Sequence, residues 1–200
     1  MVLVGLIGAA ALSLGGVERL ISYADYPEDA LQKNQSAAAL LEVIIGPDGK
    51  VIGCSVVNVA GSRKLAEHMC KIVGRKKIPP ATLGDGTPAY SRLRMVFRML
   101  VPGEEGGSDA AGARQSAEQV LIAANLPAHL TNKVADVVLA IGAGGNVLDC
   151  APTAVTENRA VAAAACKAKS NLLIQPLVLP NGSKPVFVAN MRVAFQLDAK

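Results

Sequence analysis

Four cysteines are the residues of this chain whose type and spacing could do chemistry. Cys54 and Cys70 lie sixteen residues apart, and Cys150 and Cys166 repeat that spacing. Thiols can form disulfides, bind a metal or act as nucleophiles. Only two histidines accompany the cysteines, which leaves little material for a metal site or a catalytic nucleophile. The duplicated spacing favours two disulfides, Cys54–Cys70 and Cys150–Cys166, with pairs of reduced, buried thiols as the alternative.

The two cysteine pairs are offset by 96 residues, and this offset indicates an internal repeat. When the chain is shifted by 96, 12 of the 38 positions from 49 to 86 are identical. Between the two copies, positions 102–114 are rich in glycine and acidic residues and show no apolar period, which is typical of a flexible linker. The sequence therefore predicts two tandem domains, at 17–101 and 115–200, of which the second is divergent.

A hairpin and the helix after it are the elements that must position the first cysteine pair. Positions 38–45 and 50–59 predict two strands, joined by the turn sequence Gly-Pro-Asp-Gly. Ser62 is expected to cap the helix that follows. The inward face of the second strand should hold Ile52, Cys54 and Val56, and the apolar stripe of the helix should hold Ala66, Met69, Cys70 and Val73.

Further elements complete each copy. A short helix is expected at 27–33 and a last strand at 89–99, with its core face formed by Leu93, Met95, Phe97 and Met99. The second copy should repeat this order. We expect a helix near 115–125, strands at 134–141 and 147–155, a helix from Asn158 to about 169, and a last strand at 186–197. Pro152 predicts an edge or a strand end at its position.

The N-terminus indicates export, which agrees with disulfide formation. No charged side chain occurs from Met1 to Val17, and an apolar run there is followed by small residues. This pattern predicts a signal peptide at 1–16. A retained membrane anchor and a buried helix are the alternatives.

Composition excludes several classes of function. With 51% hydrophobic and 18% charged residues, the chain is not disordered. It has three tyrosines, three phenylalanines, no tryptophan and a net charge of only +4, so no nucleic-acid partner is expected. No constellation of acid, base and nucleophile converges in the sequence. We therefore expect no enzymatic activity, no metal and no cofactor.

Isolated polar residues are interpreted as structural. His68 is expected to be solvated rather than a metal ligand, and His129 has no identifiable nucleophile partner. The glycine-rich positions 142–146 belong to a predicted hairpin turn rather than to a phosphate loop. The basic run at 75–77 is expected to be a solvated helix end, with contact to acidic lipid of the inner membrane or to peptidoglycan as the alternative.

The first copy contains a series of short motifs in a fixed order: Asp25-Tyr26-Pro27, Ala30-Leu31, Gly46-Pro47-Asp48-Gly49-Lys50-Val51, Ala60-Gly61-Ser62, Pro80-Ala81 and Gly86-Thr87-Pro88. This series resembles the C-terminal domain of the energy transducer TonB. The family pattern is Tyr-Pro…Ala-Leu, an Asp-Gly-x-Val hairpin turn, Ser-Ser-Gly before a helix and Pro-Ala before the last strand. The resemblance covers 21–100 and, more weakly, 115–197, where Tyr-Pro and Ser-Gly are missing. The cysteine pairs resemble a subgroup with a strand-to-helix disulfide.

The resemblance implies an α+β fold of two tandem αββαβ domains, each a three-stranded antiparallel sheet packed on helices. It also implies a non-enzymatic periplasmic protein that captures an extended segment of an outer-membrane transporter, or of another envelope protein, by β-strand addition. A force-transmitting TonB has a retained membrane helix and a long Pro-rich span, so soluble binding is expected here instead. The alternative is a structural or scaffolding envelope protein that binds no peptide.

Carried over onto this chain, the family's partner contacts fall on the segment at Tyr26 and Pro27 and on the last strand. Packing is the alternative role for Tyr26 and Pro27. The arginines of the last strand could equally form an exposed face or protect an edge with charge. The partner-binding residues implied for the last strand are Tyr90, Arg92, Arg94, Val96 and Arg98.

Overall fold

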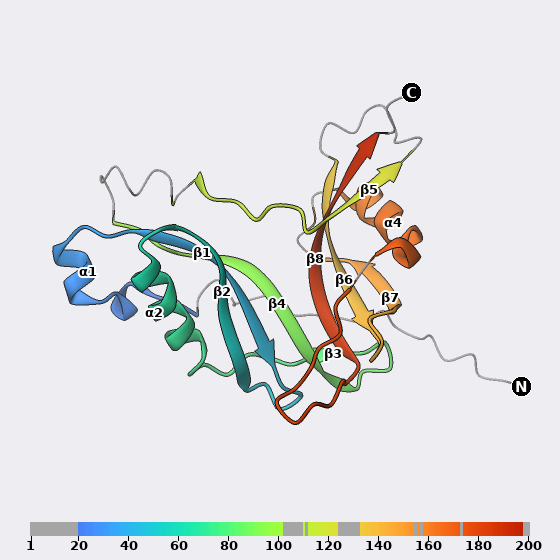
Figure 1. Cartoon of the computed structure of the whole chain (residues 1–200), viewed down its shortest axis with the longest axis horizontal. Helices are drawn as coiled ribbons and strands as arrows, with labels where there is room; N and C mark the ends of the chain where they lie inside the picture. The colour runs from blue at the N-terminus through green and yellow to red at the C-terminus, as the bar shows by residue number, and fades with distance from the viewer. Residues whose placement is uncertain are drawn as a thin grey trace, which may run out of the picture. The chain divides into compact units, whose positions relative to one another are not determined.

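The computed structural model describes residues 20–101, 110, 112–123, 133–153, 156, 158–172 and 174–197 (Figure 1). They form a mixed α+β structure that divides into two compact units. The first unit takes its described residues from Ser13–Pro79 and Arg92–Gln115, and the second takes them from Pro80–Ser91 and Ser116–Lys200. The long strand β4 (Pro88–Met99) contributes to both. The domain boundaries expected at 101 and 115 stay a prediction.

The first unit is a sheet with a helix on one face. After η2 (Tyr23–Asp25) and α1 (Glu28–Gln32), β1 (Ala37–Ile45) and β2 (Val51–Gly61) form the expected antiparallel hairpin. The strand order is β2-β1-β4, and α2 (Arg63–Val73) lies against β1 and β2 (Figure 1). The Ser62 hydroxyl accepts a hydrogen bond from the Leu65 N–H at 3.3 Å, as predicted for the helix cap.

Two bulges change the predicted face of β2. Val51 pairs with Ile45 and Gly53 with Ile44, so Ile52 is an extra residue in the ladder. Ile52 is 48% exposed, so the prediction that it lies on the inward face is wrong. Val57 is extra in the same way, because Leu40 pairs with Asn58 and Leu41 with Val56. Beyond the first bulge, Cys54 and Val56 keep the inward face.

The second unit contains the remaining strands and α4. Its strand order is β4-β8-β6-β7, with β3 beside β4 and β5 beside β8. Ala81 of β3 and Ala89 of β4 are buried with Val138, Ala140 and Val188. The elements are β3 (Ala81–Thr82), β5 (Gln119–Ala123), β6 (Val134–Ile141), β7 (Val147–Pro152), α4 (Arg159–Lys167), η3 (Lys169–Asn171) and β8 (Phe187–Leu197).

Most predictions for the second unit are confirmed. Asn158 caps α4, because its Oδ1 accepts the Val161 N–H at 3.1 Å. The glycine-rich turn closes the β6–β7 hairpin through a bond from the Gly142 N–H to the Asn146 carbonyl. Pro152 ends β7, three residues before the expected end of that strand. Leu148 is an extra residue in β7, since Val147 pairs with Ile141 and Asp149 with Ala140.

The helix expected near 115–125 is wrong. Gln119–Ala123 is the strand β5, which pairs in parallel with β8 from Val193 to Leu197. The sequence there mixes helix-favouring alanine, glutamate and glutamine with strand-favouring valine and isoleucine. Pairing with an available sheet edge decides between the two, and no local pattern reports that edge.

No helix in the described ranges is long and apolar enough to cross a membrane. The predicted signal peptide at 1–16 and His129 lie outside the described residues.

Candidate partner-binding site

The face of the β2-β1-β4 sheet opposite α2 holds most of the residues predicted to contact a partner. Cys54 lies opposite Val43 and is bonded to α2, so Val43 marks the helix face. Glu42, its neighbour on β1, therefore points to the other side, which we call the open face. Leu93, Phe97 and Met99 of β4 are buried and Met95 is half-buried, as predicted for the core face. Alternation then places Arg92, Arg94, Val96 and Arg98 on the open face.

Arg94 forms an ion pair with Glu42 across β4 and β1. Its Nη2 lies 2.6 Å from Glu42 Oε2, and its Nε donates to the same oxygen at 2.7 Å. The two side chains are only 31% and 22% exposed, so the pair is partly protected from water. Sequence reasoning missed Glu42. The sequence signal that could have indicated this pair is a lone carboxylate in the apolar run of β1, together with an arginine-rich strand that could pair with it.

A groove of about 80 Å³ opens on the open face beside Val96. Ala38 and Leu40 of β1 line it, together with Ala113 from the segment after β4. Arg98 Nη2 donates a hydrogen bond to the Ala113 carbonyl oxygen, and Ala110 is fully buried. The described part of the predicted linker therefore packs on the first unit beside Val96 and Arg98.

Tyr26 and Pro27 have packing roles in this structure. The Tyr26 hydroxyl donates to the Gln35 carbonyl oxygen, just before β1. Burial raises the pKa of Tyr26, which favours the neutral, donating hydroxyl. Pro27, with φ of −66°, precedes the first turn of α1. Tyr26 and Pro27 belong to the same unit as Arg92, Arg94 and Arg98, whereas Tyr90 belongs to the second unit.

His68 lies in a pocket of about 110 Å³ between α1 and α2, lined also by Pro27, Lys64 and Lys71. The ring is half-buried, and its Nε2–H donates to the Asp25 carbonyl oxygen at 3.1 Å. The expectation of a solvated histidine is wrong, because η2 and α1 cover this part of α2. Among the described residues, no cluster of three or more histidine, cysteine or acidic side chains could hold a metal.

Asp29 links α1 to α2, and its ion pair predicts a pH dependence. Lys64 Nζ donates to Asp29 Oδ2 at 2.7 Å, and this bond holds the pKa of Asp29 below its usual 3.8. A lowered pKa stabilises the fold above the unfolded-state value, and the contribution disappears as pH falls through the folded-state pKa. We expect the wild type to be more stable than Asp29→Asn at pH 6 and no more stable in strong acid. Thermal unfolding across a pH series checks this, and a constant difference between the two proteins would contradict it.

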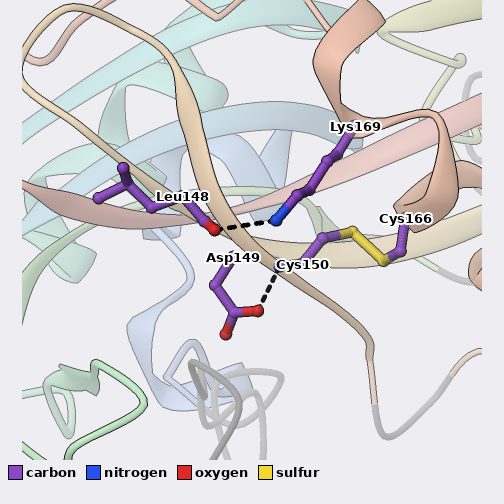
Figure 2. The surroundings of a disulfide bond; sticks show 5 residues. All are labelled: Leu148, Asp149, Cys150, Cys166 and Lys169. Carbon is purple, nitrogen blue, oxygen red and sulfur yellow. Dashed lines mark hydrogen bonds between the residues drawn. A yellow bond between two sulfur atoms is a disulfide. The ribbon is translucent and has the colours of Figure 1, made fainter.

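The cysteines form the two predicted disulfides, each between a strand and the helix after it. Cys54 of β2 is bonded to Cys70 of α2 with their Cα atoms 5.6 Å apart, and Cys150 of β7 to Cys166 of α4 at 5.3 Å. Figure 2 shows Lys169 beside the second bond, where its Nζ donates to the Leu148 carbonyl oxygen at 2.9 Å. The lysine thus binds the carbonyl of Leu148, the extra residue in the bulge of β7. All four cysteines are half-buried. Each disulfide links a helix covalently to a strand of the sheet.

Comparison with known proteins adds one match. Residues 22–99 match the family model described as Gram-negative bacterial TonB protein C-terminal. The matched segment begins just before η2 and ends with β4. No curated protein and no solved structure matches the chain.

Proposed function

We propose, on the premise that residues 22–99 form a TonB C-terminal domain, that this chain is a non-enzymatic periplasmic protein that binds envelope proteins by β-strand addition. An extended segment of an outer-membrane transporter is the first candidate partner. In this mode, main-chain hydrogen bonds give affinity, and side chains at alternate positions give specificity.

The parallel strand β5 is the observation that carries the proposal. It joins β8, the last strand of the second unit, through five consecutive residue pairs. Strand addition to a last strand is thus compatible with the geometry of this sheet. We place the external partner on β4, over the length from Arg92 to Met99 in the first unit. Val96 and Arg98 would lie nearest to it on the open face.

The disulfides support the periplasmic assignment. Disulfides persist in oxidising compartments such as the bacterial periplasm and are rare in the cytosol. The structure pairs all four cysteines. The predicted signal peptide and the family match point to the same compartment.

A second candidate function is a structural envelope protein whose sheet edges are closed within the chain. The start of β4, at Pro88–Ser91, neighbours β8 in the second unit. Ala89 is buried there with Val188. Intrachain pairing of this kind would favour a scaffold that binds no peptide.

Peptide binding separates the two functions. We would titrate the full chain, with its disulfides intact, with extended peptides derived from outer-membrane transporters. A peptide that carries N-methyl groups on alternate residues is the matched control, because it loses ladder hydrogen bonds without any change in the protein. We expect the N-methyl groups to weaken binding by at least about tenfold, or 1.4 kcal/mol. Val96→Pro should have the same effect, and Val96→Thr, which keeps the N–H and a branched side chain, should not.

Three outcomes have distinct meanings. Loss of binding with both the N-methylated peptide and Val96→Pro supports addition along β4. Binding that tolerates N-methyl groups would overturn strand addition, because side chains alone would then hold the peptide. No binding at high micromolar peptide would overturn the partner-binding function and favour the scaffold.

A further inference from the structure

We infer that residues 116–123 are an internal occupant of a second strand-addition site. In the described state they close the edge of β8 over Val193–Leu197, and an external segment of the same chemistry can bind there only when they leave. This inference rests on the proposed function and adds a regulatory step to it.

The second unit contains an antiparallel framework to which β5 is added as a parallel strand. β6 pairs with β8 from Val134 opposite Ala194 to Ile141 opposite Phe187, and β7 pairs with β6. The Cys150–Cys166 bond fastens α4 to this framework. β5 joins in parallel, at a position off the main strand order. We expect displacement of β5 to leave the β8–β6–β7 pairs and the disulfide in place.

Backbone direction shows which groups of β8 face β5. The Phe195 N–H donates to the Lys133 carbonyl, on the side of β6. Successive N–H groups along a strand point to opposite sides. The amides of Ala194 and Gln196 therefore point toward β5, and they are the donors that an incoming segment would use.

Glu118 and Leu121 are two of the residues that attach residues 116–123 to the second unit. The Glu118 N–H donates to the Arg192 carbonyl at 2.8 Å, and the Arg192 N–H donates to Glu118 Oε1 at 3.4 Å. Asp136 fixes the Arg192 guanidinium through bonds of 3.0 and 2.8 Å. Leu121 is only 7% exposed, whereas Val120 is 58% exposed. The partner class is thus an extended segment with a carboxylate followed three residues later by a buried apolar side chain.

Local sequence preference alone does not fix residues 116–123 as a strand. Alanine, glutamate, glutamine and leucine favour helix in the absence of tertiary contacts, and they make up much of 116–123. The strand conformation therefore depends on the edge of β8.

The test uses the full chain and a labelled peptide with the sequence of residues 116–123, Ser-Ala-Glu-Gln-Val-Leu-Ile-Ala. Val120→Pro should release β5, because proline removes the Val120 N–H. That N–H lies two residues after the Glu118 N–H and therefore points to the same side, toward β8. The Val120 side chain is exposed, so its replacement leaves no cavity in the core. Val120→Thr is the matched control. Apparent affinity falls by the fraction of open protein, so we expect Val120→Pro to bind the peptide at least about tenfold more tightly than wild type or Val120→Thr.

Hydrogen exchange supplies an independent readout within the same variants. The amides of Ala194 and Gln196 should exchange faster in Val120→Pro and regain protection when the peptide is added. The Phe195 amide, which faces β6, should not change and reports that the framework is intact. Leu121→Ser, which removes the buried anchor, is a second variant with the same expected pattern.

Equal peptide affinity in all proteins, with unchanged exchange at Ala194 and Gln196, would overturn the inference. That result would not affect the proposed function, because binding of transporter peptides to β4 is tested separately with Val96→Pro and Val96→Thr. Conversely, peptide 116–123 could bind Val120→Pro while no transporter peptide binds the wild type. The proposed partner class would then fail, and the internal occupancy of β8 would hold.

Discussion

Replacing Cys54 and Cys70 together by alanine is expected to lower the free energy of unfolding of the first unit by about 3 kcal/mol. The bond closes a loop with a sequence separation of 16, and chain-entropy arguments give this magnitude for such a loop. It also fastens α2 to β2, so its loss frees the helix that covers the hairpin. Denaturant unfolding without reductant measures the change. Tyrosine fluorescence reports mainly on the unfolding of the first unit, because Tyr23 and Tyr26 both lie in it.

The second cysteine pair provides the matched control. Cys150 and Cys166 have the same separation but lie in the other unit. Their replacement by alanine should leave the Tyr23 and Tyr26 signal largely unchanged while it lowers the stability of the second unit. A change below about 1 kcal/mol in the first unit, after Cys54 and Cys70 are replaced, would show that packing alone holds α2.

Gly61→Ala is expected to destabilise the first unit by at least about 3 kcal/mol. Gly61 ends β2 with φ of +90°, and an added Cβ would lie 2.2 Å from the Ser36 carbonyl oxygen. That oxygen also accepts the Ser62 N–H at 2.9 Å, which joins the start of α2 to the start of β1. Left-handed strain costs about 1–3 kcal/mol for a residue with a side chain, and the clash with backbone adds to it. Chemical unfolding of the variant measures the loss.

Gly86→Ala separates strain from crowding. Gly86 has a similar φ of +84°, but an added Cβ would meet nothing within 4 Å. We expect it to cost about 1–2 kcal/mol, the ordinary cost of a left-handed conformation for a residue with a side chain. Equal losses in the two variants would mean that backbone strain alone accounts for the effect at Gly61.

Regular periodicity made much of the fold predictable. The alternation of β4 predicted its buried face, and the stripe on α2 predicted the residues that pack on the sheet, because both patterns are set by repeating backbone geometry. The cysteine spacing predicted both disulfides for the same reason, since it joined an inward strand position to an inward helix position. Ser62 and Asn158 were found from cap chemistry, which is local.

Features that depend on tertiary context were missed. A bulge is one extra residue in a ladder, and no residue type marks Ile52 as that residue. β5 was expected to be helical because only the edge of β8 makes its segment a strand. Glu42 needed Arg94 as a partner, and the pairing of β1 with β4 joins residues 52 positions apart. His68 was misjudged because η2 and α1 cover it from outside its own helix.

The bulges at Ile52 and Leu148 have a consequence for aggregation. β2 and β7 stand at the two ends of the strand order, and each carries an extra residue just after its turn. An extra residue breaks the even spacing of N–H and C=O groups and increases the local twist. A flat strand from another copy cannot stay in register along such an edge. At high concentration the protein is therefore expected to resist growing into cross-β polymers from β2 or β7.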